Sequence, residues 1–470
     1  MDKFDVVVIG AGPAGVSGAQ AAAMMGARTL LIECESSIGG AGINTGTVPS
    51  KTLRETAIAL SGLRSRKLHG VDLSLRRDTS ITEFTHHRDN VIRGERNRIE
   101  GRLGSLGVDR MTGLASFLDP HRLSVSGKDG GTRVVAGELI LIATGSSPHR
   151  PPEFDFEHPR IHDSNEILKI DKLPRVLGIV GAGVIGCEYA STFAALGCEV
   201  HLIDGRDSLL PFLDSEISAT LAIAMSEIGV RLHLGDRVEH CRTNGLDDSV
   251  ALVLHSGLAL ACDGVLVCSG RTSNTQDLDL ELAGIQVGAR GLIGVDSDFR
   301  TSVAHIYAAG DVIGAPALAA TGMEQARAAI SRALGSDLKK HLATLLPMGV
   351  YTIPEIGAVG ETEQSLQAAG IDYVAGRWRM ADTPRGCILG DEHGMMKLLF
   401  RKSDMRLLGV HVIGEQATET VHVGMVAMLS NADAHLFNQA CFNYPTLGDL
   451  YKYATYDAFL KCRAKISPRH

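Results

Sequence analysis

The pattern of hydrophobic and polar positions repeats one arrangement twice along the chain. Near the N-terminus, residues 4–9 form an almost unbroken apolar, β-branched run, which is typical of a buried parallel strand. A glycine-rich turn, an alanine-rich helical stretch to about Gly26 and a second apolar run over residues 28–33 follow it. This order predicts a complete βαβ unit.

The same arrangement returns about 170 residues later. Residues 176–180 predict a strand, a glycine-rich turn leads into a helix that ends near Gly197, and residues 199–204 predict the closing strand. A proline-rich passage over residues 148–159 marks the boundary between the two units. The sequence therefore predicts an α/β protein with two Rossmann-like dinucleotide-binding domains.

From about residue 345 the pattern changes. Alternating runs such as residues 397–400 predict strands, and helices are predicted near residues 418–429 and 447–460. This pattern predicts a separate C-terminal α+β domain. We expect the first domain to comprise residues 1–150 and 272–344, the second residues 151–271 and the third residues 345–470.

The first glycine-rich turn has the spacing GxGxxG at residues 10–15. In this motif Gly10 makes the tight turn, Gly12 lets the backbone approach a pyrophosphate, and Gly15 lets the helix pack on the strand. An acid about 20 residues later bonds the ribose hydroxyls, and Glu33 closes the second strand at that place. The unit therefore predicts a dinucleotide resting on the helix N-terminus.

The second turn repeats the motif with Gly181, Gly183 and Gly186, and its closing acid is Asp204. An acid there favours a free ribose 2'-hydroxyl and hence NAD(H). Arg206 follows two residues later and could reach a 2'-phosphate. Use of NAD alone, use of both NAD and NADP, and an Arg206 that only faces solvent all remain open.

Two further strand ends carry groups that suit a nucleotide. Residues 142–145 end a strand with Thr144 and a glycine, Gly145, that permits close approach. Residues 306–311 end another strand with Asp311, whose carboxylate can accept hydrogen bonds from a polyol chain. We expect both segments to belong to the first site.

Composition narrows the class of protein. The net charge of −8 disfavours nucleic acid as a partner. The nine cysteines are scattered without CxxC spacing, so we expect neither a disulfide framework nor a metal site. We identify no signal peptide and no run of about 18 apolar residues, so we expect a cytoplasmic protein without membrane insertion.

Residues 39–51 carry the most specific motif. They follow the pattern GGxCxxxGCxPSK, in which the two cysteines form the redox disulfide of flavin disulfide reductases. In this chain Gly42 and Thr47 occupy the two cysteine positions. With the two nucleotide motifs, the chain resembles the flavoproteins of the glutathione reductase and dihydrolipoamide dehydrogenase group over nearly its whole length. That resemblance implies FAD on the first unit, NAD(P)(H) on the second, and a homodimer formed through the third domain.

Within this group the chain resembles the soluble pyridine nucleotide transhydrogenase family. The stretches that carry this resemblance are residues 46–55, 181–191, 351–356 and 442–446. That family has threonine at the second cysteine position, as at Thr47, and tyrosine where disulfide reductases place a catalytic histidine, as at Tyr444. It usually keeps the first cysteine, whereas this chain has Gly42.

The resemblance assigns roles to single residues. Lys51 and Glu188 match the Lys–Glu pair beside the flavin ring, and Thr47 and Tyr444 are expected to line its other face, although Thr47 could equally only pack. The expected cofactor-binding residues are Gly10, Gly12, Pro13, Ala14, Gly15, Glu33, Gly40, Thr47, Lys51, Ala115, Thr144, Gly145, Asp311, Gly181, Gly183, Ile185, Gly186, Asp204, Arg206 and Gly270.

The missing thiols restrict the chemistry. A dithiol reductase needs a thiolate and a base for its proton, and a phenol with an ordinary pKa of about 10 is a poor base near neutral pH. The first hypothesis is therefore an FAD-dependent enzyme that exchanges hydride between NAD(P)H and NAD(P)+. The alternatives are an NAD(P)H reductase of quinones or other small molecules, a flavin dehydrogenase or oxidase with another substrate, and a flavin-loaded binding or sensor protein.

Overall fold

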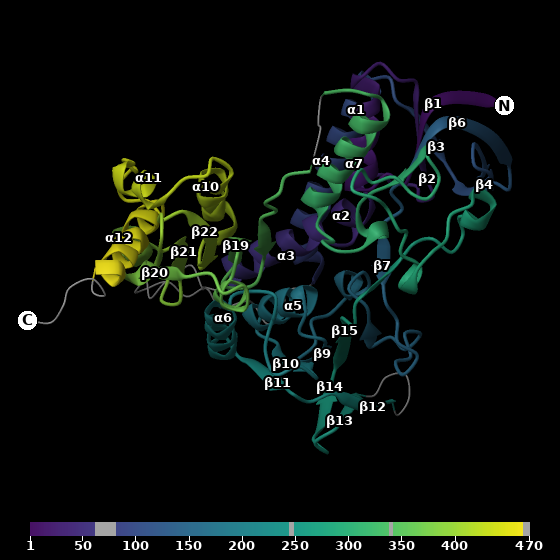
Figure 1. Cartoon of the computed structure of the whole chain (residues 1–470). Helices are drawn as coiled ribbons and strands as arrows, with labels where there is room; N and C mark the ends of the chain where they lie inside the picture. The colour runs from purple at the N-terminus through teal and green to yellow at the C-terminus, as the bar shows by residue number, and fades with distance from the viewer. Residues whose placement is uncertain (62–80, 244–248, 338–341, 464–470) are drawn as a thin grey trace, which may run out of the picture.

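The structure is a computed structural model, and it describes residues 1–61, 81–243, 249–337 and 342–463. Three parts are visible in Figure 1: an α/β part that carries the N-terminus, a second α/β part built around β9 and β10, and a C-terminal part of strands and helices. The α/β class that the sequence predicts, with two dinucleotide-binding units, is confirmed.

The first part is built on a sheet in the order β3-β2-β1-β6-β5-β4, with β17 paired to β6. The pairs among β3, β2, β1, β6 and β17 are parallel, and β5 pairs antiparallel with β6 and with β4. Helices α1 and α7 pack together. The elements are β1 (Asp2–Ile9), α1 (Pro13–Met24), β2 (Thr29–Glu33), α4 (Ile81–Ser105), β3 (Asp109–Thr112), β4 (Leu114–Asp119), β5 (Arg122–Ser126), β6 (Thr132–Ile142), β17 (Ile306–Ala308), η4 (Asp311–Ile313) and α7 (Ala319–Ala333).

The second part repeats this plan with a parallel sheet in the order β11-β10-β9-β15-β8. A three-stranded antiparallel sheet, β12-β13-β14, is attached to it. Its elements are β8 (Ile161–His162), η1 (Ile167–Lys169), β9 (Val176–Val180), α5 (Val184–Ala195), β10 (Glu199–Asp204), α6 (Ser215–Glu227), β11 (Val230–Leu234), β12 (Val238–Thr243), β13 (Val250–Leu254), β14 (Ala259–Cys262) and β15 (Gly264–Val267). A short pair, β7 (Ser146–Pro148) and β16 (Arg271–Ser273), joins the two connections between the α/β parts.

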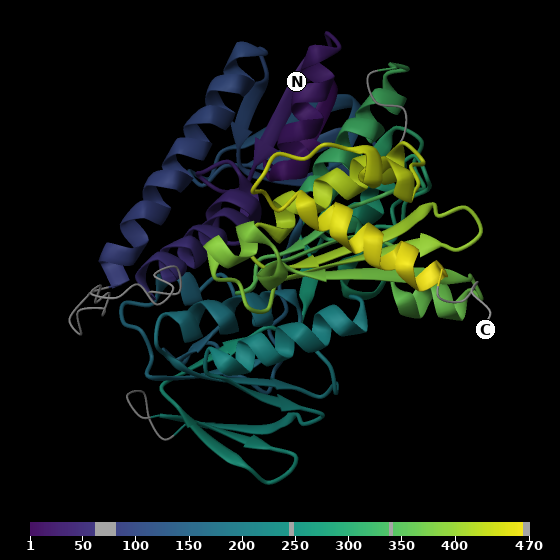
Figure 2. The ribbon, with the colours of Figure 1, turned by 90° about the vertical axis from the view of Figure 1, so that its left-hand side faces the viewer.

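The third part is an antiparallel sheet in the order β18-β19-β22-β21-β20, with helices packed on it. Figure 2 shows the yellow C-terminal helices lying across its green strands. The helices predicted near residues 418–429 and 447–460 are confirmed as α10 and α12. The elements are β18 (Met348–Val350), β19 (Ile356–Gly360), α8 (Glu363–Ala368), β20 (Tyr373–Arg379), α9 (Pro384–Leu389), β21 (Met395–Arg401), β22 (Leu407–Ile413), α10 (Ala417–Leu429), α11 (Ala434–Gln439) and α12 (Asp449–Arg463).

The motif over residues 39–51 lies where the three parts meet. It forms two helices, α2 (Gly40–Asn44) and α3 (Thr47–Leu60). Leu53 and Ala57 on α3 share one buried apolar cluster with Ala190 of α5 and Val350 of β18. Burial of this shared surface holds α3 against both the second and the third part.

A buried charge cluster also fixes the second part to the third. Lys397 on β21 has no exposed side-chain surface, and its Nζ lies 2.7 Å from Asp214 Oδ1 and 2.8 Å from Glu216 Oε2, with Glu363 as a further partner. The three acids stand close enough to hold a metal ion, but the Lys397 ammonium supplies the positive charge among them. Within the described residues, no helix is both long and apolar enough to cross a membrane.

Candidate active site

The first glycine turn is shaped by contacts that a side chain would break. Gly10 has φ +100°, and a β-carbon there would lie 2.4 Å from the Ala143 carbonyl oxygen. A β-carbon on Gly15 would lie 1.8 Å from the Gly10 carbonyl oxygen. Gly12 begins α1 without a side-chain cap, so the helix N-terminus is left for a phosphate group.

Glu33 is fixed beside this turn at the end of β2. Its Oε2 accepts a hydrogen bond of 2.7 Å from the Ala11 backbone N–H, and its Oε1 accepts one of 2.9 Å from the Glu35 backbone N–H. The Gly113 N–H donates to the Glu33 carbonyl at 2.8 Å, which brings the start of β4 and the buried Ala115 to the same edge of the sheet. The carboxylate is therefore fixed beside the turn, at the place where the sequence motif predicts an acid.

Three other predicted segments converge on the same turn. A β-carbon on Gly40 would lie 2.7 Å from the Gly12 α-carbon, and one on Gly310 would lie 3.0 Å from the Ala14 β-carbon. Asp311, which follows Gly310, accepts a hydrogen bond of 2.8 Å from Ser146.

The end of β6 also reaches this turn. The Thr144 hydroxyl donates a hydrogen bond of 2.7 Å to the Asn274 carbonyl, and Gly145 follows Thr144 with φ +70°. The structure thus gathers the residues expected at the first nucleotide.

The second glycine turn has nearly the same geometry. Gly181 has φ +103°, and a β-carbon there would lie 2.5 Å from the Cys268 carbonyl oxygen. A β-carbon on Gly186 would lie 1.8 Å from the Gly181 carbonyl oxygen. Gly183 begins α5 without a side-chain cap, Ile185 lies in its first turn, and Gly270 has φ +105° just after β15. Both turns fit a dinucleotide pyrophosphate, because a β-carbon at Gly10, Gly15, Gly181 or Gly186 would collide with the backbone and both helix N-termini lack a side-chain cap.

Asp204 and Arg206 form a two-pronged ion pair at the end of β10. Arg206 Nε lies 2.8 Å from Asp204 Oδ1, and its Nη2 lies 2.6 Å from Oδ2. Burial raises the pKa of Asp204, but its hydrogen bonds from Arg206 and from the Ala182 backbone outweigh burial, so the pKa lies below the ordinary value. Arg206 therefore does not simply face solvent, yet its side chain remains half-exposed.

Lys51 and Glu188 join the two nucleotide units. Lys51 Nζ on α3 lies 2.5 Å from Glu188 Oε2 on α5, although 137 residues separate them in sequence. The other oxygen of Glu188 accepts a hydrogen bond of 2.9 Å from the Tyr351 backbone. The ring of Tyr351 lies beneath the same ammonium, 5.0 Å from Nζ to the centroid. Tyr351 was not among the predicted site residues, and the only signal for it was its place in the family-like stretch at residues 351–356.

The two cysteine positions of the motif differ in their surroundings. Thr47 is exposed at the start of α3. At Gly42, a β-carbon would lie 2.5 Å from Cγ of Pro13 on α1. All nine cysteines are free, and burial raises the pKa of the Cys187 and Cys262 thiols to about 12. Such buried thiols stay protonated and unreactive near neutral pH.

Tyr444 does not join the other predicted catalytic residues within one chain. It lies between α11 and α12, and 72% of its surface is exposed. Those helices stand at the end of the molecule away from α3 (Figure 1). Thr47 and Tyr444 can therefore share a site only if Tyr444 comes from a second copy.

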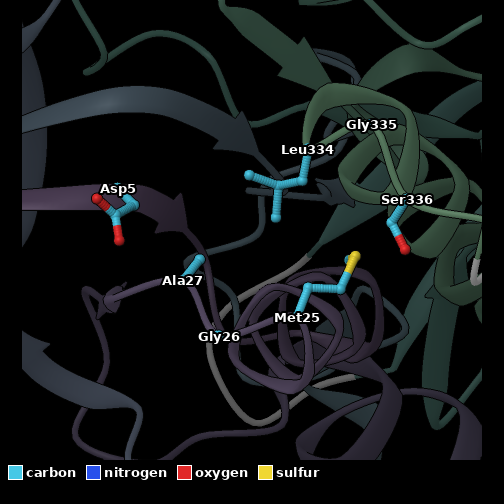
Figure 3. A pocket seen from close by; sticks show the side chains of 7 residues that line it. All are labelled: Asp5, Met25, Gly26, Ala27, Leu334, Gly335 and Ser336. Carbon is cyan, nitrogen blue, oxygen red and sulfur yellow. The ribbon is translucent and has the colours of Figure 1, made fainter.

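A separate hollow of about 450 Å³ lies away from these residues. It is lined by Asp5, by Met25 to Ala27 after α1, and by Leu334 to Ser336 after α7 (Figure 3). This is the opposite end of α1 from Gly12. None of the predicted site residues lines it, so it is not the place where the two nucleotide units meet.

Two nucleotide-binding units that meet at a partly buried Lys–Glu pair define a flavin- and nicotinamide-dependent oxidoreductase. Comparison with family models supports this class over most of the chain. The model described as pyridine nucleotide-disulphide oxidoreductase matches residues 4–333, and that of its dimerisation domain matches residues 346–455. The chain belongs to the pyridine nucleotide-disulphide oxidoreductase family, and its cofactors are FAD and NAD(P)(H).

Relatives match over nearly the full length. The chain is 40% identical to the soluble pyridine nucleotide transhydrogenase of Mycobacterium bovis, with 99% of each chain covered. It is 41% identical to that of Hahella chejuensis, with 96% of this chain and 97% of the relative covered.

Two solved structures are similar to this chain over nearly its full length. LpdA from Mycobacterium tuberculosis matches with a TM-score of 0.88, 28% identity, and 97% and 99% of the two chains covered. The HOCl-induced flavoprotein disulfide reductase RclA from Escherichia coli matches with a TM-score of 0.86 and 28% identity, with 97% of this chain and 99% of that chain covered.

Proposed function

We propose that this protein exchanges hydride between NAD(P)H and NAD(P)+ through bound FAD, without a redox disulfide. One observation carries the proposal: the Lys51–Glu188 pair is formed at the junction of the nucleotide units, while Gly42 and Thr47 leave no thiol in the motif beside it. The names of the relatives that are about 40% identical support the same activity.

The proposal assigns one cofactor to each unit. Residues 1–150 and 272–344 would hold FAD, with Gly10, Gly12 and Gly15 at its pyrophosphate and Glu33 at its ribose. Residues 151–271 would hold the nicotinamide nucleotide on the second turn. The matching backbone contacts at the two turns support this division.

Lys51 would act by its charge. Bound flavin supplies the chemistry by taking a hydride from one nicotinamide and giving it to another. Glu188 holds the Lys51 ammonium in one position, and the Tyr351 backbone in turn holds Glu188. A fixed cation stabilises negative charge that develops nearby and needs no reorganisation during the reaction. Without a thiol pair, the chain also needs no base for a thiol proton.

We further propose a cytoplasmic homodimer formed by residues 345–470. The match of residues 346–455 to a dimerisation domain supports the homodimer, and so does the exposure of Tyr444 between two helices that lie away from α3 (Figure 1). In such a dimer Tyr444 of one copy would approach Thr47 of the other and restrict access to that side of the site. The quinone alternative has no support from the names of the relatives.

The flavin spectrum of the holoprotein tests the function. NADPH added without oxygen should bleach the flavin absorbance, and NAD+ should then restore it. If NADH and NADPH both leave the flavin oxidised, the proposal is wrong. If a quinone restores the absorbance and NAD+ does not, the enzyme is a quinone reductase instead.

A further inference from the structure

A second cavity, of about 330 Å³, lies between α2, α3, α4 and η1. Its wall carries four basic side chains, Arg88, Arg93, Arg96 and Lys169, and a single acid, Asp89, among the described residues. This concentration of positive charge stands out in a chain whose net charge is −8. Its volume falls at the lower end of the range for small-molecule pockets.

Most of this positive charge has no counter-ion in the part of the chain that the structure describes. Asp89 pairs with Arg88 at 2.8 Å, and that neutralises one cation. Arg96 Nε donates to Asn44 Oδ1 at 2.8 Å, which is a neutral acceptor. The side chains of Arg93 and Lys169 make no hydrogen bond or ion pair with side chains or backbone of residues 1–61, 85–243, 249–337 and 342–463. Three cations therefore face the cavity without an acid from these ranges to balance them.

The cavity is separate from the dinucleotide turns. The side of α2 with Gly40 and Gly42 packs on Gly12 and Pro13 of α1. Asn44 instead binds Arg96 of α4 and, with Thr45, lines the cavity. The cations thus lie on the other side of the α2–α3 segment from the first glycine turn.

We propose that this cavity binds a small anion with two or more negative charges. Arginine forks and a lysine point charge suit phosphate and carboxylate oxygens, and their hydrogen bonds to such anions are among the strong ones in proteins. Phosphate groups and polycarboxylates share this chemistry. The cavity is too small for nucleic acid.

Calorimetric titration of the holoenzyme, kept saturated with NAD+ to fill the nucleotide site, tests the proposal with inorganic pyrophosphate in one arm and citrate in the other. We expect saturable binding of at least one anion, at one site per chain, that weakens as salt is added. The double variant Arg93→Gln/Lys169→Gln should weaken it about tenfold or more, since it removes two charge-assisted contacts.

Arg98→Gln is the matched control. Arg98 is an exposed arginine on the same helix, and it pairs with Glu95 outside the cavity. Binding of both anions by this control should match the wild type. Absence of binding in both arms overturns the proposal, as does equal binding by the double variant and the wild type, or an equal loss in Arg98→Gln. Flavin content and melting temperature confirm that each variant is folded.

Discussion

Gly42 lies against Pro13 so closely that a β-carbon on the glycine would be 2.5 Å from Cγ of the proline ring. Pro13 is the first residue of α1, the helix whose N-terminus lies at the site proposed for FAD. The ring is rigid, so any side chain at position 42 must push α2 away from α1. At the first cysteine position of the motif, the chain therefore has close packing between α2 and the first glycine turn.

Substituting Gly42→Ala should therefore destabilise the protein, by about 1–3 kcal/mol, because it overpacks the contact with Pro13. Gly101→Ala is the matched control, since its β-carbon meets nothing within 4 Å on α4. At position 101 the better helix propensity of alanine should stabilise the protein by about 0.5–1 kcal/mol. Thermal unfolding of the holoproteins separates the two, and equal melting temperatures would contradict the packing argument.

Lys51→Ala should slow flavin reduction by NADPH about 10²- to 10³-fold, since it removes a positioned charge. Glu188→Gln should slow flavin reduction less than Lys51→Ala does, because the Lys51 charge remains and only the contact that holds it is weakened. Stopped-flow absorbance of the flavin measures both rates. A Lys51→Ala protein with normal FAD content and a normal reduction rate would refute the electrostatic role.

Arg206→Gln should weaken the use of NADPH more than that of NADH. A 2'-phosphate would draw the guanidinium from Asp204, and losing a hydrogen bond to a charged group costs about 1.5–3 kcal/mol. The KM for NADPH should therefore rise about tenfold or more, with little change for NADH. Arg231→Gln, an exposed arginine paired with Glu199 in the same sheet, is the control. Equal losses with both coenzymes would instead mean that Arg206 only orders the turn.

Val426→Lys should convert a dimer into monomers. Val423, Val426 and Leu429 are exposed on one stretch of α10 in the C-terminal part, and a charge there would be buried at the proposed interface. Ile223→Lys is a matched control, because both side chains are 57% exposed and Ile223 lies on α6 of the second part. Light scattering after gel filtration gives the mass. A wild-type monomer, or a dimeric Val426→Lys, would contradict the proposal.

The nucleotide turns could be predicted from the sequence because they are local. A buried strand, three spaced glycines and an acid at the next strand end lie within about 25 residues, and steric contacts inside that span fix the geometry. Both units occur as expected, with the acids Glu33 and Asp204 each accepting a hydrogen bond from the backbone of its own turn.

The junction between the parts could not be predicted in the same way. The contact of Glu188 with Tyr351 joins residues 163 positions apart and depends on how three parts pack, which no local pattern encodes. The strand predicted over residues 397–400 is confirmed, and Lys397 lies in it as part of β21. Its complete burial depends on Asp214, 183 residues away, so the pattern alone would place such a lysine at the surface.

This lysine gives a prediction that depends on pH. Burial raises the pKa of Asp214, but the hydrogen bond from Lys397 and one from the Glu363 backbone outweigh burial and bring the pKa below its ordinary value. The Asp214 carboxylate therefore stabilises the wild type at every pH above the ordinary carboxyl range, and this stability is lost only as the pH falls through the lowered pKa. His411 is the cross-strand neighbour of Lys397. Burial lowers the pKa of the His411 ring below the ordinary histidine value, so the ring takes up a proton only at a lower pH than an exposed histidine.

Lys397→Met should cost about 3–5 kcal/mol at pH 7, because it leaves Asp214 buried without its cation. Burial then dominates in the variant and raises the folded pKa of Asp214, so the variant should regain stability as the pH falls from 7 to 5 and the carboxyl takes up a proton. The gap in melting temperature between wild type and variant should narrow over that range. Lys402→Met, at an exposed pair with Asp372, should cost less than about 1 kcal/mol at either pH. A gap that stays constant or widens on acidification would show that Lys397 acts by packing and not by its charge.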